Sequence, residues 1–528
     1  MQGAKIPHIR NLALSALSAI LLSLSFPGYD IEVLAWLSLL PLFLIIKGGS
    51  TRNAFLWCWF SGTLFFFITV NWVIKTMNNY GGIPLWVSLL ILLLLSLYLG
   101  LYFGVFGLLT RYVIAKTALP LPCVAPLLWV SLEYVRAHLL TGLPWASLGY
   151  SQYRFLHLIQ IADITSVLGV SFMVVAVNAA LFEVFSFSGT ELNSVPNSNG
   201  KGGFGKWHKI ISVSAVAFSF LLSLAYGYHR LNRSYDNPER ELSVAVLQGN
   251  IPQDLKWDRA FQRRTIDIYK RLTAESRQHQ ARLVIWPETA APFFFQTPST
   301  YRQELFDLAK EENVFLLFGS PSYTIGADTT PKLFNSAYLI SPNGQSLSRY
   351  DKRHLVPFGE YIPLSKILFF IEKMVVGIGD FVPGRDYTLF QIPQAKFGVV
   401  ICFEVIFPDL VRQFVLNGAE FMATITNDAW FGRSAAPYQH FAMVVFRAIE
   451  NRVYFARAAN TGISGFISPK GETLEASPLF VEDALLRTIS PSTTRTIYTA
   501  YGDISAYVSI FITGILMILA VFFRPSNS

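Results

Sequence analysis

Long apolar runs dominate the first part of the chain and return once near its end. Runs of ~17 to 25 apolar residues are typical of helices that cross a membrane. We therefore expect eight transmembrane helices, although the first two runs are short enough to form a tight hairpin. A cleaved signal peptide is the alternative for the first run, but no small-residue cleavage site follows it. The runs cover approximately residues 12–25, 33–46, 54–74, 85–109, 119–135, 164–187, 210–228 and 505–523.

Between Arg230 and Ile504 the pattern changes to short apolar stretches that alternate with amphipathic ones. Such a pattern predicts strands and helices in turn, and the turn signals between them favour an α/β sandwich with a mixed sheet and its chemistry at strand ends. The domains are then 1–229 with helices one to seven, 230–504 as one α/β domain, and 505–528 with helix eight. The expected strands cover residues 242–247, 283–286, 314–318, 337–340, 397–401, 421–426 and 462–468, and the expected helices 261–279, 301–312, 410–417 and 438–457.

Basic residues flank the apolar runs mostly on one side, if each run crosses the membrane once. Loops rich in Lys and Arg face the cytoplasm. Both termini are therefore expected in the cytoplasm and the α/β domain outside it, with Arg136 and Arg154 as the main exceptions. The basic side carries Lys5, Arg10, Lys47, Arg52, Arg111, Lys116, Lys201, Lys206, Lys209 and Arg524.

The composition supports a membrane protein, since 52% of the 528 residues are hydrophobic and only 14% are charged. A net charge of +8 would suit nucleic acid, but the basic residues are dispersed or gathered at the ends of apolar runs. Membrane topology explains them better, and we expect no nucleic-acid partner. Cys58 and Cys123 fall in apolar runs, so Cys402 has no obvious disulfide partner.

Cys402 ends the apolar stretch 397–401, and Phe407-Pro408-Asp409 then opens the amphipathic stretch that follows. The thiol is thus expected at a strand-to-helix turn. Backbone N–H groups at a helix start can lower a thiol pKa from roughly 8.5 towards neutrality, which favours a nucleophile. The alternative is a small buried core residue, which is what most free cysteines are.

Two more polar residues stand out beside apolar stretches of the same domain. Glu288 follows Trp286-Pro287, and Lys352 lies in a polar segment that continues to Glu360. A glutamate can take the proton of a thiol, while a lysine favours the thiolate and neutralises the oxyanion of a tetrahedral intermediate. Each residue taken alone is more often a solvated surface charge.

The order of Glu288, Lys352 and Cys402, each in its own motif, resembles the carbon–nitrogen hydrolase (nitrilase) superfamily and within it the apolipoprotein N-acyltransferase family. The resemblance implies a nitrilase-like α-β-β-α domain on the periplasmic side of a bacterial inner membrane. The motifs that carry it are Leu247-Gln248-Gly249-Asn250-Ile251, Trp286-Pro287-Glu288-Thr289, the segment 352–360, Asn427-Asp428-Ala429-Trp430-Phe431, Gly142-Leu143-Pro144-Trp145, Gly149-Tyr150-Ser151-Gln152 and Tyr501-Gly502-Asp503.

The resemblance also implies an activity. Cys402 would take an acyl chain from a phospholipid donor, typically the sn-1 chain of phosphatidylethanolamine, as a thioester. The chain would then pass to the α-amino group of the diacylglyceryl-cysteine that begins an apolipoprotein acceptor. Glu288 would be the base and Lys352 the oxyanion-stabilising cation, with Glu360 and Glu404 as supporting carboxylates. Residues expected near the substrate are Trp257, Asn335, Phe403, Asn427 and Trp430.

One departure from the family is visible, because the residue after the nucleophile is often tyrosine there and is Phe403 here. Two rival functions stay open. A membrane-bound amidase would use the same three residues with water as acceptor, and a transporter or scaffold would not need Cys402 at all. The eight histidines show no ligand spacing, so we expect neither a metal nor another cofactor.

Two further hypotheses concern individual segments. Residues 362–381 are apolar with two glycines, which suggests a lid over the site that dips into the lipid, with ordinary core packing as the alternative. Glu133 and Arg136 are three apart in an apolar run, where charges are usually paired or functional. We favour an intrahelical pair over contact with lipid headgroups.

Overall fold

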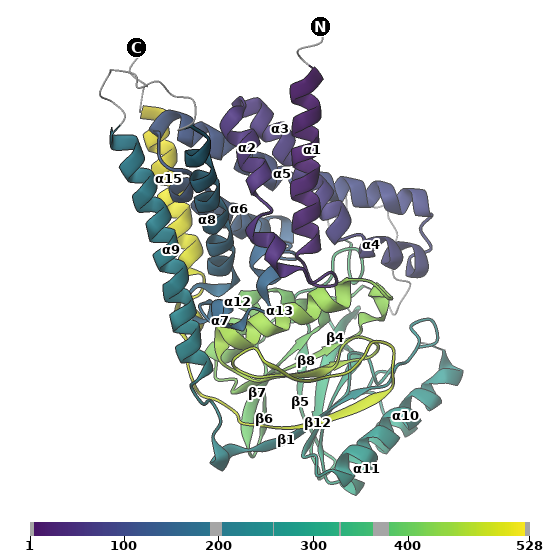
Figure 1. Cartoon of the computed structure of the whole chain (residues 1–528). Coiled ribbons are helices and arrows are strands. Elements are labelled where there is room, and N and C mark those ends of the chain that lie inside the picture. Colours follow the sequence, from purple (N-terminus) through teal and green to yellow (C-terminus); the bar gives the residue numbers. More distant parts are fainter. Residues whose placement is uncertain (1–4, 191–202, 257, 327–328, 363–379, 523–528) are drawn as a thin grey trace. The chain divides into compact units, whose positions relative to one another are not determined.

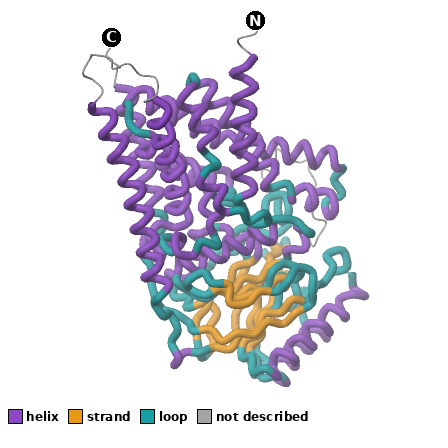
Figure 2. The backbone as a smooth tube through the Cα atoms, in the orientation of Figure 1, coloured by secondary structure: helices purple, strands orange, loops and turns teal. Residues whose placement is uncertain are grey.

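The computed structural model describes residues 5–190, 203–256, 258–326, 329–362 and 380–522. The chain divides into two compact units, a helical unit of Met1–Asn71, Leu89–Asn232 and Asp503–Ser528, and an α/β unit of Trp72–Ser88 and Arg233–Gly502. Every strand that the structure describes lies in the α/β unit, as the orange tube in Figure 2 shows. Trp257 and nearly all of the expected lid lie outside the described residues.

Within the residues described, five helices are long and apolar enough to cross a membrane, or six spans are present if α3 (Thr51–Thr69) is joined to the bent segment Trp72–Tyr80 after it. The predicted membrane domain is therefore supported, while the count of eight crossings remains a prediction. The helices of the helical unit are α1 (Lys5–Leu24), α2 (Leu40–Gly48), α3 (Thr51–Thr69), α5 (Leu85–Thr117), α6 (Leu121–His138), α7 (Leu156–Ile159), α8 (Ala162–Thr190), α9 (Gly203–Leu231) and α15 (Ile504–Phe522).

The second apolar run is not one continuous helix. A short 3-10 turn, η1 (Glu32–Trp36), precedes the nine-residue helix α2. The Asn178 side chain on α8 accepts a hydrogen bond from the Leu39 N–H at 3.0 Å and donates one to the Ala35 carbonyl at 2.9 Å. Because these backbone groups find a buried partner, the chain can break the helix inside an apolar region without leaving them unsatisfied.

Glu133 and Arg136 are both buried on α6, and their charged groups are 4.0 Å apart. Arg136 also donates to the Trp145 carbonyl at 2.6 Å, and Glu133 accepts from the Leu148 N–H at 2.7 Å. The expected pairing is present, and it serves mainly to hold the segment 143–148 against the helix.

In its described residues the α/β unit contains two six-stranded sheets, with strand orders β12-β1-β2-β3-β4-β5 and β11-β10-β9-β8-β7-β6. In each sheet three neighbouring strands are parallel (β1 to β3, and β7 to β9), and the remaining strands pair antiparallel. The strands are β1 (Leu242–Gln248), β2 (Leu283–Ile285), β3 (Phe315–Ile325), β4 (Pro331–Ile340), β5 (Ser346–Asp351), β6 (Leu389–Ile392), β7 (Ala395–Ile401), β8 (Phe421–Thr426), β9 (Phe455–Ala459), β10 (Gly465–Ile467), β11 (Thr473–Ala476) and β12 (Asp483–Ile489).

Helices cover the outer face of each sheet, so the predicted α-β-β-α sandwich is confirmed (Figure 1). The helices α10 (Arg259–Gln278) and α11 (Thr300–Glu311) pack on the first sheet through a buried apolar cluster that includes Tyr269, Trp286 and Leu305. The helices α12 (Pro408–Leu416) and α13 (Ala436–Asn451) pack on the second sheet. The central strands bury nearly every residue, which explains their continuous apolar pattern.

The expected helix 438–457 is wrong at its end. The helix α13 stops at Asn451, and Arg452 follows in the left-handed conformation with a φ of 54°. The chain then enters β9, which pairs in parallel with β8 and buries all five of its residues. Sheet pairing therefore overrides the local helical pattern there. The strands β5, β6, β11 and β12 were not predicted, since each carries several polar or half-exposed residues.

Candidate active site

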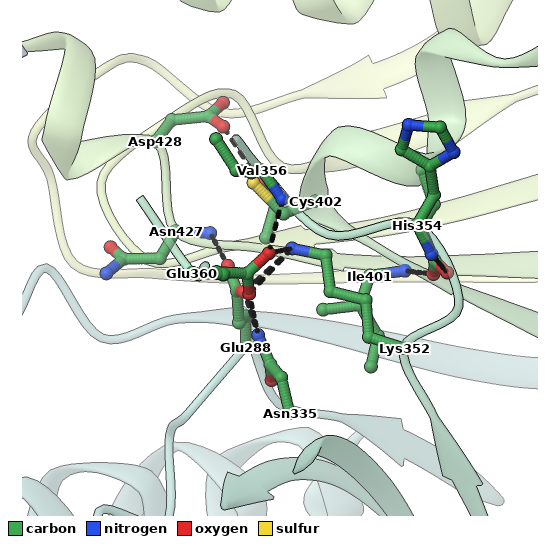
Figure 3. A network of polar contacts seen from close by, with 12 residues as sticks. Glu288, Asn335, Lys352, His354, Val356, Glu360, Ile401, Cys402, Asn427 and Asp428 are labelled. Atoms are coloured by element: carbon green, nitrogen blue, oxygen red, sulfur yellow. Dashed lines mark hydrogen bonds and ion pairs between the residues drawn. The ribbon is translucent and has the colours of Figure 1, made fainter. Parts of the chain in front are cut away.

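Polar side chains gather where the central strands of the two sheets end (Figure 3). Glu288 comes three residues after β2, Cys402 directly after β7, and Asn427 directly after β8. Lys352 directly follows β5, and Asn335 lies on the neighbouring strand β4. Because parallel strands bring their carboxyl ends to one edge, the fold collects these residues from distant parts of the chain.

The Glu288 carboxylate is held from both sheets. Its Oε1 accepts a hydrogen bond from the Asn335 side-chain amide at 2.7 Å, and its Oε2 accepts one from the backbone N–H of Asn427 at 3.0 Å. Gly319 on β3 makes room for this turn, because a Cβ there would lie 2.7 Å from the Glu288 Cα. The carboxylate is fixed in place, but it stays partly accessible with 7% of Glu288 exposed.

Lys352 is a buried cation of the site that lies between two carboxylates. Its Nζ lies 2.9 Å from Glu360 Oε2 and 3.8 Å from Glu288 Oε1. Burial by itself would lower the pKa of Lys352, but the carboxylates of Glu360 and Glu288 outweigh it and raise that pKa above its ordinary value. Lys352 therefore carries a positive charge at every physiological pH. Glu360 also binds Asn335 and the Val356 N–H, which keeps its carboxylate next to the ammonium.

The Cys402 thiol does not have the lowered pKa that its position at a strand end suggested. Burial raises its pKa to about 12, with a further contribution from the Glu288 charge that Lys352 only partly offsets. The expectation of a pKa near neutrality is thus wrong, because the desolvation of a group that is only 8% exposed raises the pKa more than a helix start lowers it. The resting thiol is protonated, and a base must remove its proton during attack.

The nucleophile turn is strained and firmly held. Cys402 has a φ of 52°, in the left-handed region that side chains with a Cβ rarely adopt. Glu404, fully buried two residues on, accepts hydrogen bonds from the Ile401 N–H at 2.7 Å and from the Arg353 N–H at 2.7 Å. This carboxylate therefore ties the turn of Cys402 to the segment that carries Lys352.

A second buried cluster supports the same turn from the other side. The Asp428 carboxylate lies 2.6 Å from Arg457 Nη2 and 3.1 Å from His440 Nδ1, and His440 Nε2 lies 3.2 Å from the Cys402 carbonyl oxygen. Although burial opposes it, the charge of Arg457 holds the pKa of Asp428 below its ordinary range. The three residues connect the end of β8 to the backbone of the nucleophile.

Sequence reasoning gave no role to Asp428, His440 or Arg457. In the sequence Asp428 lies within the motif 427–431, His440 is one of eight scattered histidines, and Arg457 lies at the end of the expected helix 438–457. Their contacts could not be predicted from local sequence, since His440 and Cys402 are 38 positions apart.

Lys256 is a further residue that the sequence analysis passed over. Only 3% of Lys256 is exposed, and its Nζ donates a hydrogen bond to the Glu288 backbone carbonyl at 2.9 Å. Burial lowers the pKa of Lys256 to about 8, against the charges of Glu288 and Cys402. A second cation therefore faces the same acid and thiol, and its charge titrates close to neutral pH.

The residues expected near the substrate are placed as follows. Asn335 and Asn427 join the Glu288 network directly. Phe403 packs against Phe407 with 5.3 Å between ring centroids, and Trp430 packs against Tyr80 at 5.0 Å. Trp257 lies outside the described residues.

The chemistry available to this arrangement is nucleophilic attack on a carbonyl. A thiol, a fixed carboxylate and a permanent cation stand together, with a second cation beside them. Among the residues that the structure describes, no group of three or more His, Cys, Asp or Glu side chains is arranged to hold a metal ion.

Comparisons with known proteins match both parts of the chain. Residues 18–180 match the family described as apolipoprotein N-acyltransferase N-terminal domain, and residues 243–499 match the carbon–nitrogen hydrolase family. An apolipoprotein N-acyltransferase of Geobacter metallireducens is 41% identical, with 98% of this chain and 96% of the relative covered. The Pasteurella multocida enzyme of the same name is 32% identical over 93% and 91% of the two chains. A solved amidase from Nesterenkonia sp. aligns with 49% of this chain and 94% of its own, at 19% identity and a TM-score of 0.38.

Proposed function

The chain belongs to the apolipoprotein N-acyltransferase family, and we propose that Cys402 carries an acyl chain as a thioester from a phospholipid to the amino terminus of a lipoprotein. The resemblance read from the sequence is thereby confirmed at the level of the family, and the chain is an acyltransferase that N-acylates lipoproteins. The donor, the covalent intermediate and the residue roles are the proposal. The observation that carries it is the meeting of Cys402 with Glu288 and Lys352 at one strand edge.

In the first half-reaction the Cys402 sulfur attacks the carbonyl carbon of a phospholipid ester, for which we propose the sn-1 ester of phosphatidylethanolamine. Glu288 takes the thiol proton as the carbon–sulfur bond forms. A thiol whose pKa is about 12 supports this order of events, because it would not ionise unaided. The bond to the glycerol oxygen then breaks, and Glu288 returns the proton to that oxygen. The products are the thioester and a lysophospholipid.

The tetrahedral intermediate carries a negative oxygen, which Lys352 stabilises. Its ammonium is buried and permanently charged, so the stabilisation needs no proton transfer at the moment of reaction. Glu360 keeps this ammonium in place through the 2.9 Å contact to its Nζ. Lys256 adds a second positive charge as long as it is protonated.

In the second half-reaction the free α-amino group of a diacylglyceryl-cysteine attacks the thioester carbonyl. Glu288 accepts a proton from the amine and passes it to the departing Cys402 sulfur, so that the amide forms and the free thiol is regenerated. Asn335 and Asn427 hold the Glu288 carboxylate for both steps. Phe403, Trp430 and Trp257 are proposed to contact the lipid or the lipoprotein.

The membrane placement is part of the proposal. Donor and product carry several acyl chains, and each buried CH₂ is worth about 0.8 kcal/mol, so neither molecule leaves the bilayer easily. We place the α/β domain, residues 230–504, on the periplasmic face and both termini in the cytoplasm, with eight crossings in 1–229 and 505–528. The distribution of basic residues along the sequence supports this orientation.

The test is mass spectrometry of the purified protein after incubation with phosphatidylethanolamine labelled in its sn-1 chain. We expect the labelled acyl mass on the Cys402 peptide, removed by hydroxylamine. Addition of a diacylglyceryl lipopeptide with a free amine should transfer the label to the peptide. Loss of the label to water at the same rate without the lipopeptide would instead indicate a hydrolase. Absence of the label from the Cys402 peptide would contradict the thioester mechanism.

A further inference from the structure

The segment Trp72–Tyr80 stands between two apolar helices in the chain but belongs to the α/β unit. The helix α3 ends at Thr69, and α5 begins at Leu85. Between them lie a single helical turn, α4 (Trp72–Lys75), which Figure 1 labels, and a π-helical turn, η2 (Thr76–Tyr80). Such irregular turns inside an apolar region often serve a function.

Three side chains of this segment donate hydrogen bonds to backbone carbonyls of one short turn. Lys75 Nζ donates to the Arg433 carbonyl at 2.6 Å, Thr76 Oγ1 to the Trp430 carbonyl at 3.0 Å, and the Tyr80 hydroxyl to the Ala429 carbonyl at 3.0 Å. We call residues 428–433, which include the 3-10 turn η7 (Asp428–Phe431), the receiving turn.

Two aromatic pairs add to these hydrogen bonds. The rings of Trp72 and Phe431 lie 4.8 Å apart, and those of Tyr80 and Trp430 lie 5.0 Å apart, both edge to face. Such pairs contribute beyond the area that they bury. Every residue from Ala429 to Arg433 except Gly432 is thus contacted by a polar or aromatic group of the segment. A Cβ added to Gly432 would lie 3.7 Å from Lys75 Cδ, so this residue is also close to the segment.

Two contacts that hold the active site are made at the start of the receiving turn. The backbone N–H of Asn427, one residue before it, donates to Glu288 at 3.0 Å. Asp428, its first residue, lies 3.1 Å from His440, whose other ring nitrogen is 3.2 Å from the Cys402 carbonyl. A shift of this turn would therefore disturb the acid and the backbone of the thiol residue together.

We propose that the segment Trp72–Tyr80 is a positioning element of the active site, which holds the receiving turn so that Asn427 stays on Glu288 and Asp428 stays on His440. Its side chains act through backbone groups and need not touch the substrate. The proposal rests on the role of Glu288 in the proposed function. It makes positioning residues of four side chains, those of Trp72, Lys75, Thr76 and Tyr80, which stand between apolar helices in the chain.

The test compares the double variant Thr76→Val/Tyr80→Phe with Asn78→Ala. The double variant removes two of the three hydrogen bonds and keeps the Tyr80 ring against Trp430. Asn78 lies in the same turn, but its side chain donates to the Ile83 carbonyl at 2.9 Å, so it is a matched control. The readout is the alkylation rate of Cys402 by iodoacetamide, followed on its own peptide by mass spectrometry between about pH 5 and about pH 9.

We expect Cys402 in the double variant to react about tenfold more slowly, since loss of about 1.4 kcal/mol of positioning is tenfold in rate. We also expect the pH profile of the alkylation rate to shift, because Glu288 is no longer held where it takes the thiol proton. Asn78→Ala should behave as the unaltered protein. A rate and profile unchanged in the double variant, or an equal loss in Asn78→Ala, would overturn the proposal.

Two additions keep the outcome clear. If the double variant shows a lowered thermal midpoint, Tyr80→Phe alone carries the test, with the same shift of the pH profile expected at a smaller loss of rate. Alkylation needs no lipid, so the positioning role can hold even if no acyl-enzyme forms with phospholipid. That second result would contradict the proposed function alone.

Discussion

The first sheet of the α/β unit, β1 to β5 with β12, and the second, β6 to β11, have the same sequence of strand directions but different residues at their strand ends. The first sheet supplies Glu288 after β2 and Lys352 after β5. The second supplies Cys402 after β7 and the supporting pair Asn427 and Asp428 after β8. Acid and cation thus come from one sheet and the thiol from the other.

The strands β1 and β7 occupy equivalent places in the two sheets, and the turns after them have similar backbone conformations. After β1 comes Asn250 with a φ of 50°, and after β7 comes Cys402 with a φ of 52°. Asn250 donates its backbone N–H to Asn460 at 2.9 Å and so joins the sheets, whereas the Cys402 side chain faces Glu288 and Lys352. The shared strand plan provides two similar turns, and the second of them carries the thiol that faces Glu288 and Lys352.

The largest effect is expected for Cys402→Ala, which removes the only nucleophile proposed for the second sheet. Acyl transfer should fall about 10⁵-fold, since no other group can form the thioester. The measurement is transfer of a labelled acyl chain from phospholipid to a lipopeptide. Cys123→Ala is the matched control and should keep full activity. Residual transfer above about one part in a thousand would show that the thiol is not essential.

Glu288→Gln tests the contribution of the first sheet. The amide keeps the size of the side chain but cannot take the thiol proton, so acylation of Cys402 should slow about 10³-fold. Because burial and Glu288 together raise the thiol pKa to about 12, the variant thiol should also titrate at lower pH. Glu304→Gln, a change on α11 where the carboxylate pairs with Arg263 and Lys270, is the control. Normal acylation in Glu288→Gln would assign the base to another residue.

Lys352→Met should reduce the acylation rate about 10²-fold, because the oxyanion loses its permanent cation. It also leaves the Glu360 and Glu288 carboxylates without their shared partner, so a lower thermal midpoint is expected as well. Single-turnover kinetics separate the two effects when measured well below that midpoint. The same change at Lys270, which pairs with Glu304 on the surface, should leave the rate unchanged.

The smallest effect concerns the charge of Lys256. Its pKa of about 8 means that it is positive below that pH and neutral above it, so the rate should decline as pH rises through about 8. Lys256→Arg keeps its charge at every such pH and should abolish this decline. Lys256→Met should show the lower rate, by about tenfold, at all pH values. A decline that persists unchanged in Lys256→Met would assign it to another group.

The sequence predicted the helical unit only in part. Apolar runs located the long helices, yet they did not predict the break between η1 and α2. That break depends on Asn178, 139 positions away from Leu39. The apolar pattern of a helix can be read from the residues of the helix itself. The buried side chain that makes an interruption possible lies elsewhere in the sequence and cannot be read from that pattern.

For this protein the sequence determined the apolar spans, most strands of the two sheets and the polar residues that end them, because periodicity and strand termination are local properties. Only the tertiary structure decided the raised thiol pKa of Cys402, the position of Lys256 and the cluster of Asp428, His440 and Arg457. It alone brought Trp72–Tyr80 to the receiving turn, about 350 positions further along the chain. Burial and the distance between charges set these properties, and both depend on segments that meet only after folding.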